Sequence, residues 1–195
     1  MAESIFDLQT DLLYWQRLLR LAGYYDGAID GIPGSLTQFG AERWAADAAR
    51  CKLETGMFDE RTERNLSTLL PEAQKAARQW FQIARLEARN RGYEVKIICG
   101  TRTYAEQNAL CKQRPKVTNA CGGQSWHNFG LAWDFGIFQG RKYFGDHPLY
   151  SLLGNLYKQV DSLDWGGTWK SFVDLPHLQL KKFRSIKEAR QCFET

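Results

Sequence analysis

Two of the three histidines in this 195-residue chain lie close in sequence to a carboxylate. His127 is followed by Asp134, and His177 is preceded by Asp174. A catalytic zinc site takes three protein ligands from His, Asp, Glu or Cys and leaves a fourth position for water. His127, Asp134 and His177 can supply such a set. Asp174 then remains beside the metal, where a carboxylate can act as general base toward water. The third histidine, His147, lies in a Gly-Asp-His-Pro segment that predicts a loop.

The segments around these residues alternate as strands do. Over 131–138 the large apolar residues fall on one face, and Asp134 lies between small residues on the other. A bare buried carboxylate is costly unless it is paired or bound to a metal. A last strand over 177–180 places His177 and Gln179 on one face. Each predicted strand therefore carries its candidate functional side chains on the face opposite its large apolar residues.

The remaining pattern is mostly helical. Capping residues support one helix directly, because Thr103 and Glu106 form a capping-box pair. Tryptophan and glycine in 164–169 predict a loop. The spacing predicts helices over 5–22, 36–50, 71–91, 103–112, 148–163 and 185–192, with a further strand over 93–99.

Two domains are predicted from this order of elements. Residues 1–70 form a small all-α unit of three helices, in which Asp-Gly and Pro-Gly pairs mark tight turns. Residues 71–195 form an α+β domain with a small antiparallel sheet and flanking helices. The first unit has 7 basic and 11 acidic residues, and the second has 19 and 11. The basic second unit favours an anionic partner, for which nucleic acid and the bacterial cell wall are both candidates on charge alone.

The bulk sequence excludes some classes. No apolar run approaches the roughly 20 residues of a membrane span, and the amino terminus lacks the pattern of a secretory signal. The five cysteines form no Cys-x-x-Cys pair. Cys111 and Cys121 could close a loop, but we expect unpaired thiols in a reducing compartment.

The histidine and aspartate motifs closely resemble those of the zinc D-Ala-D-Ala carboxypeptidase and L-alanyl-D-glutamate endopeptidase family of peptidoglycan hydrolases. The resemblance covers about residues 75–182. The tryptophan- and glycine-rich 164–172 looks most like the endopeptidase branch, including phage endolysins, and that branch also has aspartate at position 174. The motifs that carry the family resemblance are Ser125-x-His127-x-x-Gly130-x-Ala132-x-Asp134, Asp174-x-x-His177, and Gly100-Thr101-Arg102-Thr103 with Gln107.

The resemblance implies roles for these residues. Zn²⁺ would be held by His127, Asp134 and His177. Asp174 would take a proton from water and pass it to the leaving amine, and Arg102 would stabilise the oxyanion or hold a substrate carboxylate. The resemblance also implies substrate or supporting contacts for two further residues, Ser125 and Gln107.

The first 70 residues resemble the peptidoglycan-binding module found beside many cell-wall hydrolases. The turn sequence Gly23-Tyr24-Tyr25-Asp26-Gly27, then Asp30-Gly31, Gly34 and Thr37, carries this resemblance. It implies substrate contacts for Asp30, Gly31 and Thr37. The alternative is that these residues only build turns between helices.

Together these features predict a monomeric endolysin that cleaves the L-Ala–D-Glu bond of the stem peptide and lyses a bacterial host. It would be made in the host cytoplasm and act on the wall after release. One alternative is a D-Ala-D-Ala carboxypeptidase of the same family. Another is a zinc-containing wall-binding protein without catalysis. No nucleic-acid motif accompanies the positive charge, so a nucleic-acid partner is not expected.

Overall fold

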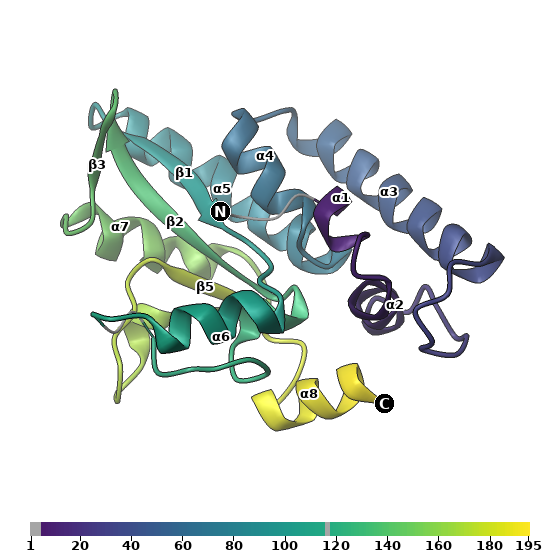
Figure 1. The fold of residues 1–195 in the computed structure, drawn as a ribbon. Coiled ribbons are helices and arrows are strands. Elements are labelled where there is room, and N and C mark those ends of the chain that lie inside the picture. Colours follow the sequence, from purple (N-terminus) through teal and green to yellow (C-terminus); the bar gives the residue numbers. More distant parts are fainter. Residues whose placement is uncertain (1–4, 116–117) are drawn as a thin grey trace.

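A computed structural model describes residues 5–115 and 118–195 (Figure 1). Residues 5–70 form helices joined by loops, as predicted, but the helix expected over 5–22 is two helices. The break falls where the Asp11 carboxylate accepts the Tyr14 N–H at 3.1 Å and caps the second helix. The helices of this part are α1 (Ile5–Leu8), α2 (Leu12–Leu21), α3 (Ser35–Thr55) and α4 (Glu60–Ser67).

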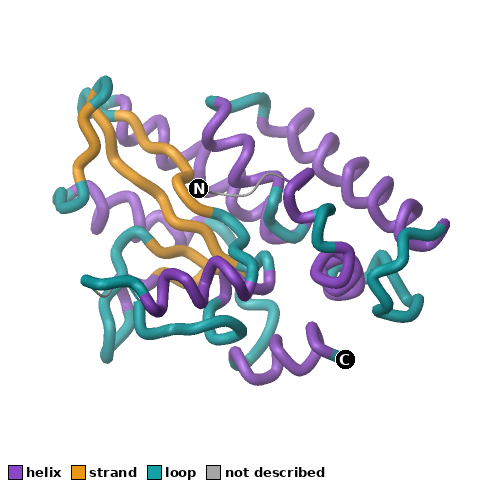
Figure 2. Tube along the Cα trace, viewed as in Figure 1, coloured by secondary structure: helices purple, strands orange, loops and turns teal. Residues whose placement is uncertain are grey.

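The rest of the chain combines helices with an antiparallel sheet (Figure 2). The strand order is β1-β2-β5-β4. Strand β5 pairs with the first residues of β2, and β3 pairs with its last residues. The α+β class is therefore confirmed. The elements are α5 (Pro71–Arg89), β1 (Glu94–Cys99), α6 (Tyr104–Lys112), the 3-10 helix η1 (Trp126–Phe129), β2 (Ala132–Gln139), β3 (Lys142–Phe144), α7 (Leu149–Asn155), η2 (Leu156–Gln159), β4 (Leu163–Trp165), η3 (Gly166–Thr168), β5 (His177–Leu180) and α8 (Ile186–Glu194).

Two short strands depart from the prediction. In place of the single helix expected over 148–163, the chain forms α7 followed by η2. Strand β4 begins at the last residue of that range and continues into the loop predicted over 164–169. The strand β3 was not predicted at all. Both are three residues long, which is too short for alternation to identify a strand. Pairing with β5 and β2 forms them instead.

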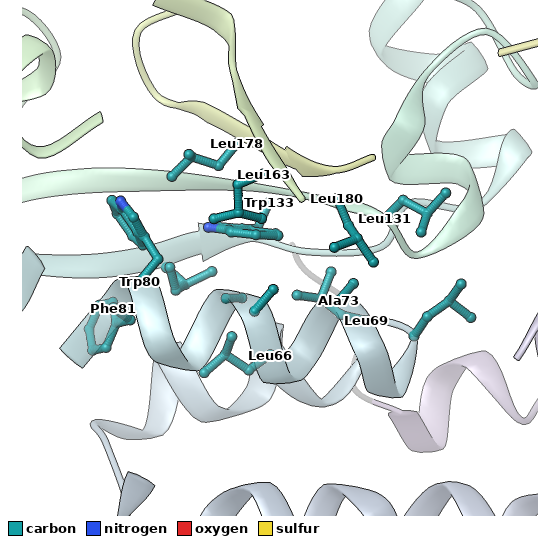
Figure 3. Packing of buried hydrophobic residues seen from close by; sticks show 14 of the residues in the cluster. Leu66, Leu69, Ala73, Trp80, Phe81, Leu131, Trp133, Leu163, Leu178 and Leu180 are labelled. Atoms are coloured by element: carbon teal, nitrogen blue, oxygen red, sulfur yellow. The ribbon is translucent and has the colours of Figure 1, made fainter. Parts of the chain in front are cut away.

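The apolar face of β2 packs on α5 (Figure 3). Trp133 and Phe135 of β2 are fully buried, as is Trp80 of α5. The rings of Trp80 and Phe135 lie 4.9 Å apart. Because alternate residues of a strand point to opposite faces, this packing turns Asp134 to the other side of the sheet. The core thus fixes the direction of the candidate site.

The helical first part is joined closely to the sheet. Strand β1 lies at the sheet edge, and α4 satisfies its outward backbone groups. Ile97 N–H donates to Thr62 Oγ1 at 3.1 Å, and Asn65 Nδ2 donates to Ile97 O at 2.9 Å. One cluster of buried apolar side chains includes residues of α2, α5 and β2. The division at residue 70 stays a prediction, and any such boundary crosses these contacts.

The expectation of unpaired thiols is wrong for two cysteines. Cys111, in α6, and Cys121 form a disulfide with their Cα atoms 5.1 Å apart. The chain returns to α6 because Gly122 N–H donates to Asn108 Oδ1 at 2.8 Å. Cys51, Cys99 and Cys192 are free thiols. Within the part of the chain that the structure describes, no helix is long and apolar enough to cross a membrane.

Candidate active site

Strand register brings two of the predicted ligands together. Asp134 lies on the inner strand β2, directly opposite His177 of β5. Side chains of directly opposite residues share a face and lie close to each other. His177 Nδ1 is 3.2 Å from Asp134 Oδ1. The contact between these residues, 43 positions apart, therefore follows from the pairing of β2 with β5.

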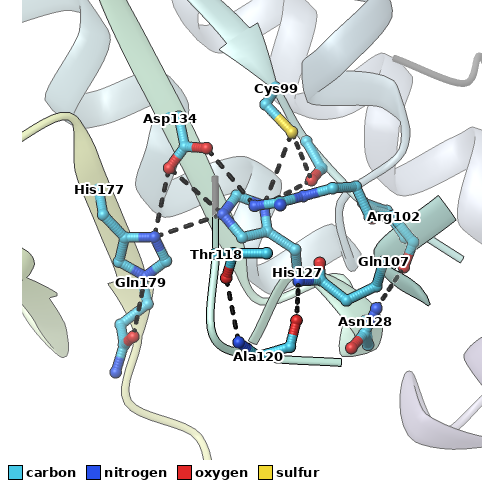
Figure 4. A network of polar contacts seen from close by, with 12 residues as sticks. Cys99, Arg102, Gln107, Thr118, Ala120, His127, Asn128, Asp134, His177 and Gln179 are labelled. Carbon is cyan, nitrogen blue, oxygen red and sulfur yellow. Dashed lines mark hydrogen bonds and ion pairs between the residues drawn. The ribbon is translucent and has the colours of Figure 1, made fainter. Parts of the chain in front are cut away.

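His127 reaches the same point from η1 (Figure 4). Its Nε2 lies 3.2 Å from Asp134 Oδ1 and 3.3 Å from His177 Nδ1. The backbone holds it there, since Arg102 N–H donates to His127 O at 3.0 Å. The two histidine side chains are almost fully buried, while that of Asp134 is 23% exposed. Three potential ligand atoms thus converge at a site that opens past the carboxylate.

The three distances fit a tetrahedral metal ion. Zinc binds nitrogen and oxygen at about 2.0–2.2 Å, which places neighbouring ligands of a tetrahedron about 3.4 Å apart. The observed separations of 3.2, 3.2 and 3.3 Å match three edges of such a tetrahedron. One vertex is left for another ligand.

Hydrogen bonds on the outer nitrogens point both imidazole lone pairs toward this centre. His127 Nδ1 lies 2.7 Å from Gly100 O, and His177 Nε2 lies 3.0 Å from Gln179 Oε1. Both partners are acceptors, so these nitrogens carry the protons. In these tautomers the inner nitrogens, His127 Nε2 and His177 Nδ1, have lone pairs that face the Asp134 carboxylate, so no proton lies between these atoms. A cation between them resolves that conflict, and such outer partners orient ligands in metal sites.

Cys99 offers a different ligand set, because its Sγ lies within 4.8 Å of potential ligand atoms of His127 and Asp134. The set is chemically poor. Sγ lies 3.9 Å from His127 Nδ1, and that nitrogen already donates to Gly100 O. Burial raises the pKa of the Cys99 thiol to about 12, whereas a metal needs the thiolate. The two histidines with Asp134 are the better set.

At neutral pH, His127 and Asp134 are in the charge states that bind a metal. Burial lowers the pKa of His127 to about 4, and Arg102 acts in the same direction. Burial opposes ionisation of Asp134, but the two neighbouring histidines hold its pKa well below the usual range. Burial also disfavours the charged form of His177, yet the carboxylates of Asp134 and Asp174 raise its pKa, so a metal would displace a proton from this ring. A neutral His127 beside a carboxylate is the form that ligates.

Arg102 lies beside Asp134, and Asp174 interacts electrostatically with Asp134 and His177. An Arg102 guanidinium nitrogen lies 3.5 Å from Asp134 Oδ2, and Arg102 Nε has no partner among the described residues. Asp174 is half-buried, and burial raises its pKa, with a further contribution from Asp134. Its backbone is packed tightly against Gly166, where an added Cβ would lie 2.4 Å from Asp174 O. The glycine of this segment therefore sets the position of Asp174.

The two further residues of the predicted site lie behind it. Gln107 is buried, and its Nε2 donates to Ala120 O at 2.7 Å, while its Oε1 has no partner among the described residues. Ser125 is half-buried just before η1, and its N–H donates to Asn128 Oδ1 at 3.3 Å. Both residues support the segment that carries His127. Their contact with substrate stays a prediction.

The residues predicted to bind substrate in the first part gather around Gln16 instead. Gln16 is fully buried. Its Nε2 lies 3.0 Å from Asp30 Oδ1 and 3.4 Å from Thr37 Oγ1, and its Oε1 accepts the Gly31 N–H at 2.8 Å. The structure thus gives Asp30, Gly31 and Thr37 roles in folding their loop, away from the metal ligands. Binding of peptidoglycan there stays a prediction.

Sequence reasoning did not identify the two groups that accept the outer protons of the histidines, Gln179 Oε1 and Gly100 O. Gln179 shares a strand face with His177, so the period of two was a usable signal for its role. Gly100 contributes a carbonyl, and no side chain could have revealed that. Its missing Cβ does matter, because a Cβ there would lie 2.4 Å from Asn65 O and from Thr68 Oγ1 of the helical part.

Comparison with known proteins agrees with this geometry. Residues 118–180 match the family model described as D-alanyl-D-alanine carboxypeptidase. The segment that holds all three ligands and Asp174 is therefore related to this peptidase family, as its motifs predicted. The matched segment does not include the first 70 residues.

Individual proteins also resemble the chain. It is 39% identical over 107 residues to the peptidoglycan L-alanyl-D-glutamate endopeptidase CwlK of Bacillus subtilis, covering 48% of this chain and 64% of the relative. The chain thus spans slightly under two thirds of that protein. The crystal structure of the Serratia marcescens L-Ala D-Glu endopeptidase ChiX superposes with a TM-score of 0.50 at 22% identity, over 66% of this chain and 92% of that one. This second match concerns the fold.

Proposed function

We propose that the protein is a zinc-dependent peptidoglycan hydrolase that cleaves the L-Ala–D-Glu bond of the stem peptide. The observation that carries the proposal is the convergence of His127, Asp134 and His177 at tetrahedral spacing, with Arg102 3.5 Å from Asp134. The similarity to an L-alanyl-D-glutamate endopeptidase supports the choice of bond.

In this proposal the chain's own groups have separate tasks. His127, Asp134 and His177 would hold zinc, which as a Lewis acid lowers the pKa of water at its open position to about 7. The Asp174 carboxylate accepts a proton from water and delivers it to the amine that leaves. The Arg102 guanidinium binds the oxygen on which negative charge develops.

A D-Ala–D-Ala carboxypeptidase is the second candidate. The description of the matched family favours it. The motif resemblance favours the endopeptidase, because that branch has aspartate where the carboxypeptidases commonly have glutamate. The two activities use the same metal centre and differ in the peptide that it accepts.

We further propose that the enzyme is a monomeric endolysin that degrades the wall of a bacterial host after release from the cytoplasm. The positive charge of residues 71–195 favours approach to an anionic wall. The Cys111–Cys121 disulfide suits a protein that works outside the reducing cytoplasm. The loop around Gln16 remains the candidate for holding peptidoglycan.

The test is mass spectrometry of purified peptidoglycan digested by the zinc-loaded protein, with a chelator-treated sample as control. We expect new amino-terminal D-glutamate, with L-alanine left on the muramyl side. Release of D-alanine alone would favour the carboxypeptidase. Absence of any chelator-sensitive product from several wall types would leave a wall-binding protein as the better account.

A matched pair of variants ties the product to the site. His127→Ala removes a proposed ligand, and His147→Ala removes the histidine that packs against Tyr93 and Phe144 instead. We expect the product to disappear only with the first. Equal loss in both variants would count against the assigned centre.

A further inference from the structure

Tyr14 of the helical first part reaches the backbone of the candidate active site. Its side chain is 5% exposed. Its hydroxyl lies 2.5 Å from Asn128 O and 3.1 Å from Arg102 O. These two carbonyls belong to segments 26 residues apart, and Tyr14 comes from a third. A phenol has one proton to donate, and the shorter distance assigns it to Asn128 O.

The two carbonyls lie where the metal-binding and oxyanion-binding segments join. Arg102 N–H donates to His127 O at 3.0 Å, and Asn128 Nδ2 donates to Arg102 O at 2.8 Å. These bonds set the position of Arg102 relative to His127. Tyr14 adds a bond at the same junction from outside the two segments. A small shift there would move the guanidinium relative to the metal ligands.

Two aromatic rings from other helices hold the Tyr14 ring in place. Its centroid lies 5.1 Å from that of Phe193 and 6.3 Å from that of Tyr104, both in edge-on geometry. Phe193 belongs to α8, which lies beside α2 (Figure 1), and it also packs 5.4 Å from Phe129. Helices α2 and α8 thus fix the hydroxyl against the junction. Such rigid support is what a precise catalytic geometry needs.

We propose that Tyr14 is a positioning residue for the reaction, so that α2 is part of the support of the active site. The inference rests on the proposed function. It differs from the expectation that residues 1–70 serve wall binding alone. Tyr14 contacts backbone and aromatic rings behind the site, so its effect falls on the turnover of bound substrate.

The test compares Tyr14→Phe with Tyr104→Phe. Both remove one hydroxyl from the same aromatic cluster, but the Tyr104 hydroxyl lies 3.2 Å from exposed Glu194. For cleavage of a soluble stem peptide, we expect Tyr14→Phe to lower kcat about 10-fold with KM nearly unchanged, as for other supporting partners of metal ligands. We expect retention on insoluble peptidoglycan to be unchanged, and Tyr104→Phe to behave as the parent protein.

A spectroscopic readout separates this inference from the proposed activity. In the cobalt-substituted protein, we expect Tyr14→Phe to alter the visible absorption of the metal, and Tyr104→Phe to leave it as in the parent. An inactive parent protein would end the proposed function, while the cobalt spectra would still test positioning. Parent-like kcat and spectrum in Tyr14→Phe would overturn the inference, as would equal effects in both variants.

A second variant serves if Tyr14→Phe fails to fold. Phe193→Leu keeps the hydroxyl but removes the ring that packs 5.1 Å away. We expect a smaller loss of kcat, about 3-fold, again with KM nearly unchanged and a shifted cobalt spectrum. A folded Phe193→Leu protein with parent-like kcat and spectrum would overturn the proposal.

Discussion

Two buried polar centres of this protein differ in how their atoms are matched. Around Gln16 every close contact pairs a donor with an acceptor. The amide Nε2 donates to Asp30 Oδ1 and to Ile32 O, while Oε1 accepts the backbone N–H groups of Asp30 and Gly31. Around Asp134, two imidazole nitrogens and a carboxylate oxygen face one another as acceptors. The donors and acceptors of the first centre are matched, whereas the second needs a proton or a metal ion between its facing atoms.

This difference separates a structural role from a functional one. A satisfied buried network stabilises the fold, and an unsatisfied one costs free energy unless something binds. Substitution at Gln16 should therefore lower stability and leave metal affinity alone. Substitution at Asp134 should lower metal affinity without lowering the stability of the metal-free protein. The following predictions test this contrast.

The largest effect is expected for Asp134→Asn. The amide keeps the shape of the carboxylate but loses its charge and brings a donor to the two histidines. We expect zinc binding to be lost and peptide cleavage to fall by roughly 10³-fold or more, because the Lewis acid is gone. The melting temperature of the metal-free protein should be no lower than that of the metal-free parent. Metal analysis, cleavage assays and calorimetry check these outcomes, and a variant that keeps zinc would contradict the assignment.

Asp174→Asn should abolish catalysis while the metal stays. The carboxylate is assigned to proton transfer, a role worth about 10²–10⁴-fold in rate, and is not one of the three ligands. The matched control is Asp161→Asn, at an exposed position on the same part of the chain. Zinc content and kcat are measured together. Parallel loss of zinc and activity would make Asp174 a ligand or a structural residue.

Gln179→Ala removes the acceptor that fixes the His177 tautomer. We expect zinc affinity to fall about 10- to 100-fold, the usual range for an outer partner of a ligand. Cys99→Ala provides the contrast, because the thiol is not in the preferred ligand set, and its zinc affinity should stay near that of the parent. Competition with a chromophoric chelator gives both values. A larger loss for Cys99→Ala would favour the alternative set with Cys99.

The sequence was informative where function depends on residue type and strand period. Asp134 and His177 could each be placed on the polar face of its own strand because large apolar residues alternate with them, and the structure pairs the two across β2 and β5. The capping box at Thr103 was equally local and is confirmed. These features are encoded within a few neighbouring residues.

Contacts between distant segments were not predictable in this way. The Cys111–Cys121 disulfide depends on the return of a loop to α6, and Tyr14 meets Asn128 across 114 positions. Gly100 acts through a carbonyl that any residue possesses. Packing of the whole chain decides such contacts, so local periodicity carries no signal for them.

The smallest effect on chemistry is expected for Gln16→Ala, which is the counterpart of Gln179→Ala. Both variants remove a buried amide, but Gln16→Ala removes the partner of the Asp30 carboxylate and of two backbone N–H groups. We expect a loss of about 1–3 kcal/mol in the free energy of unfolding, with zinc affinity and cleavage of a soluble peptide unchanged. Urea unfolding and chelator competition, run on both glutamine variants, measure the two responses.

Peptidoglycan retention adds a third measurement to the same pair. If the loop with Asp30, Gly31 and Thr37 holds the wall, loosening it through Gln16→Ala weakens retention on insoluble peptidoglycan, whereas Gln179→Ala leaves it intact. Gln38→Ala, at an exposed glutamine of α3, is the surface control. Unchanged retention in a destabilised Gln16→Ala protein would limit this loop to a folding role. A fall in zinc affinity in Gln16→Ala would instead show that the Gln16 and Asp134 centres are coupled, which would contradict the proposed contrast between them.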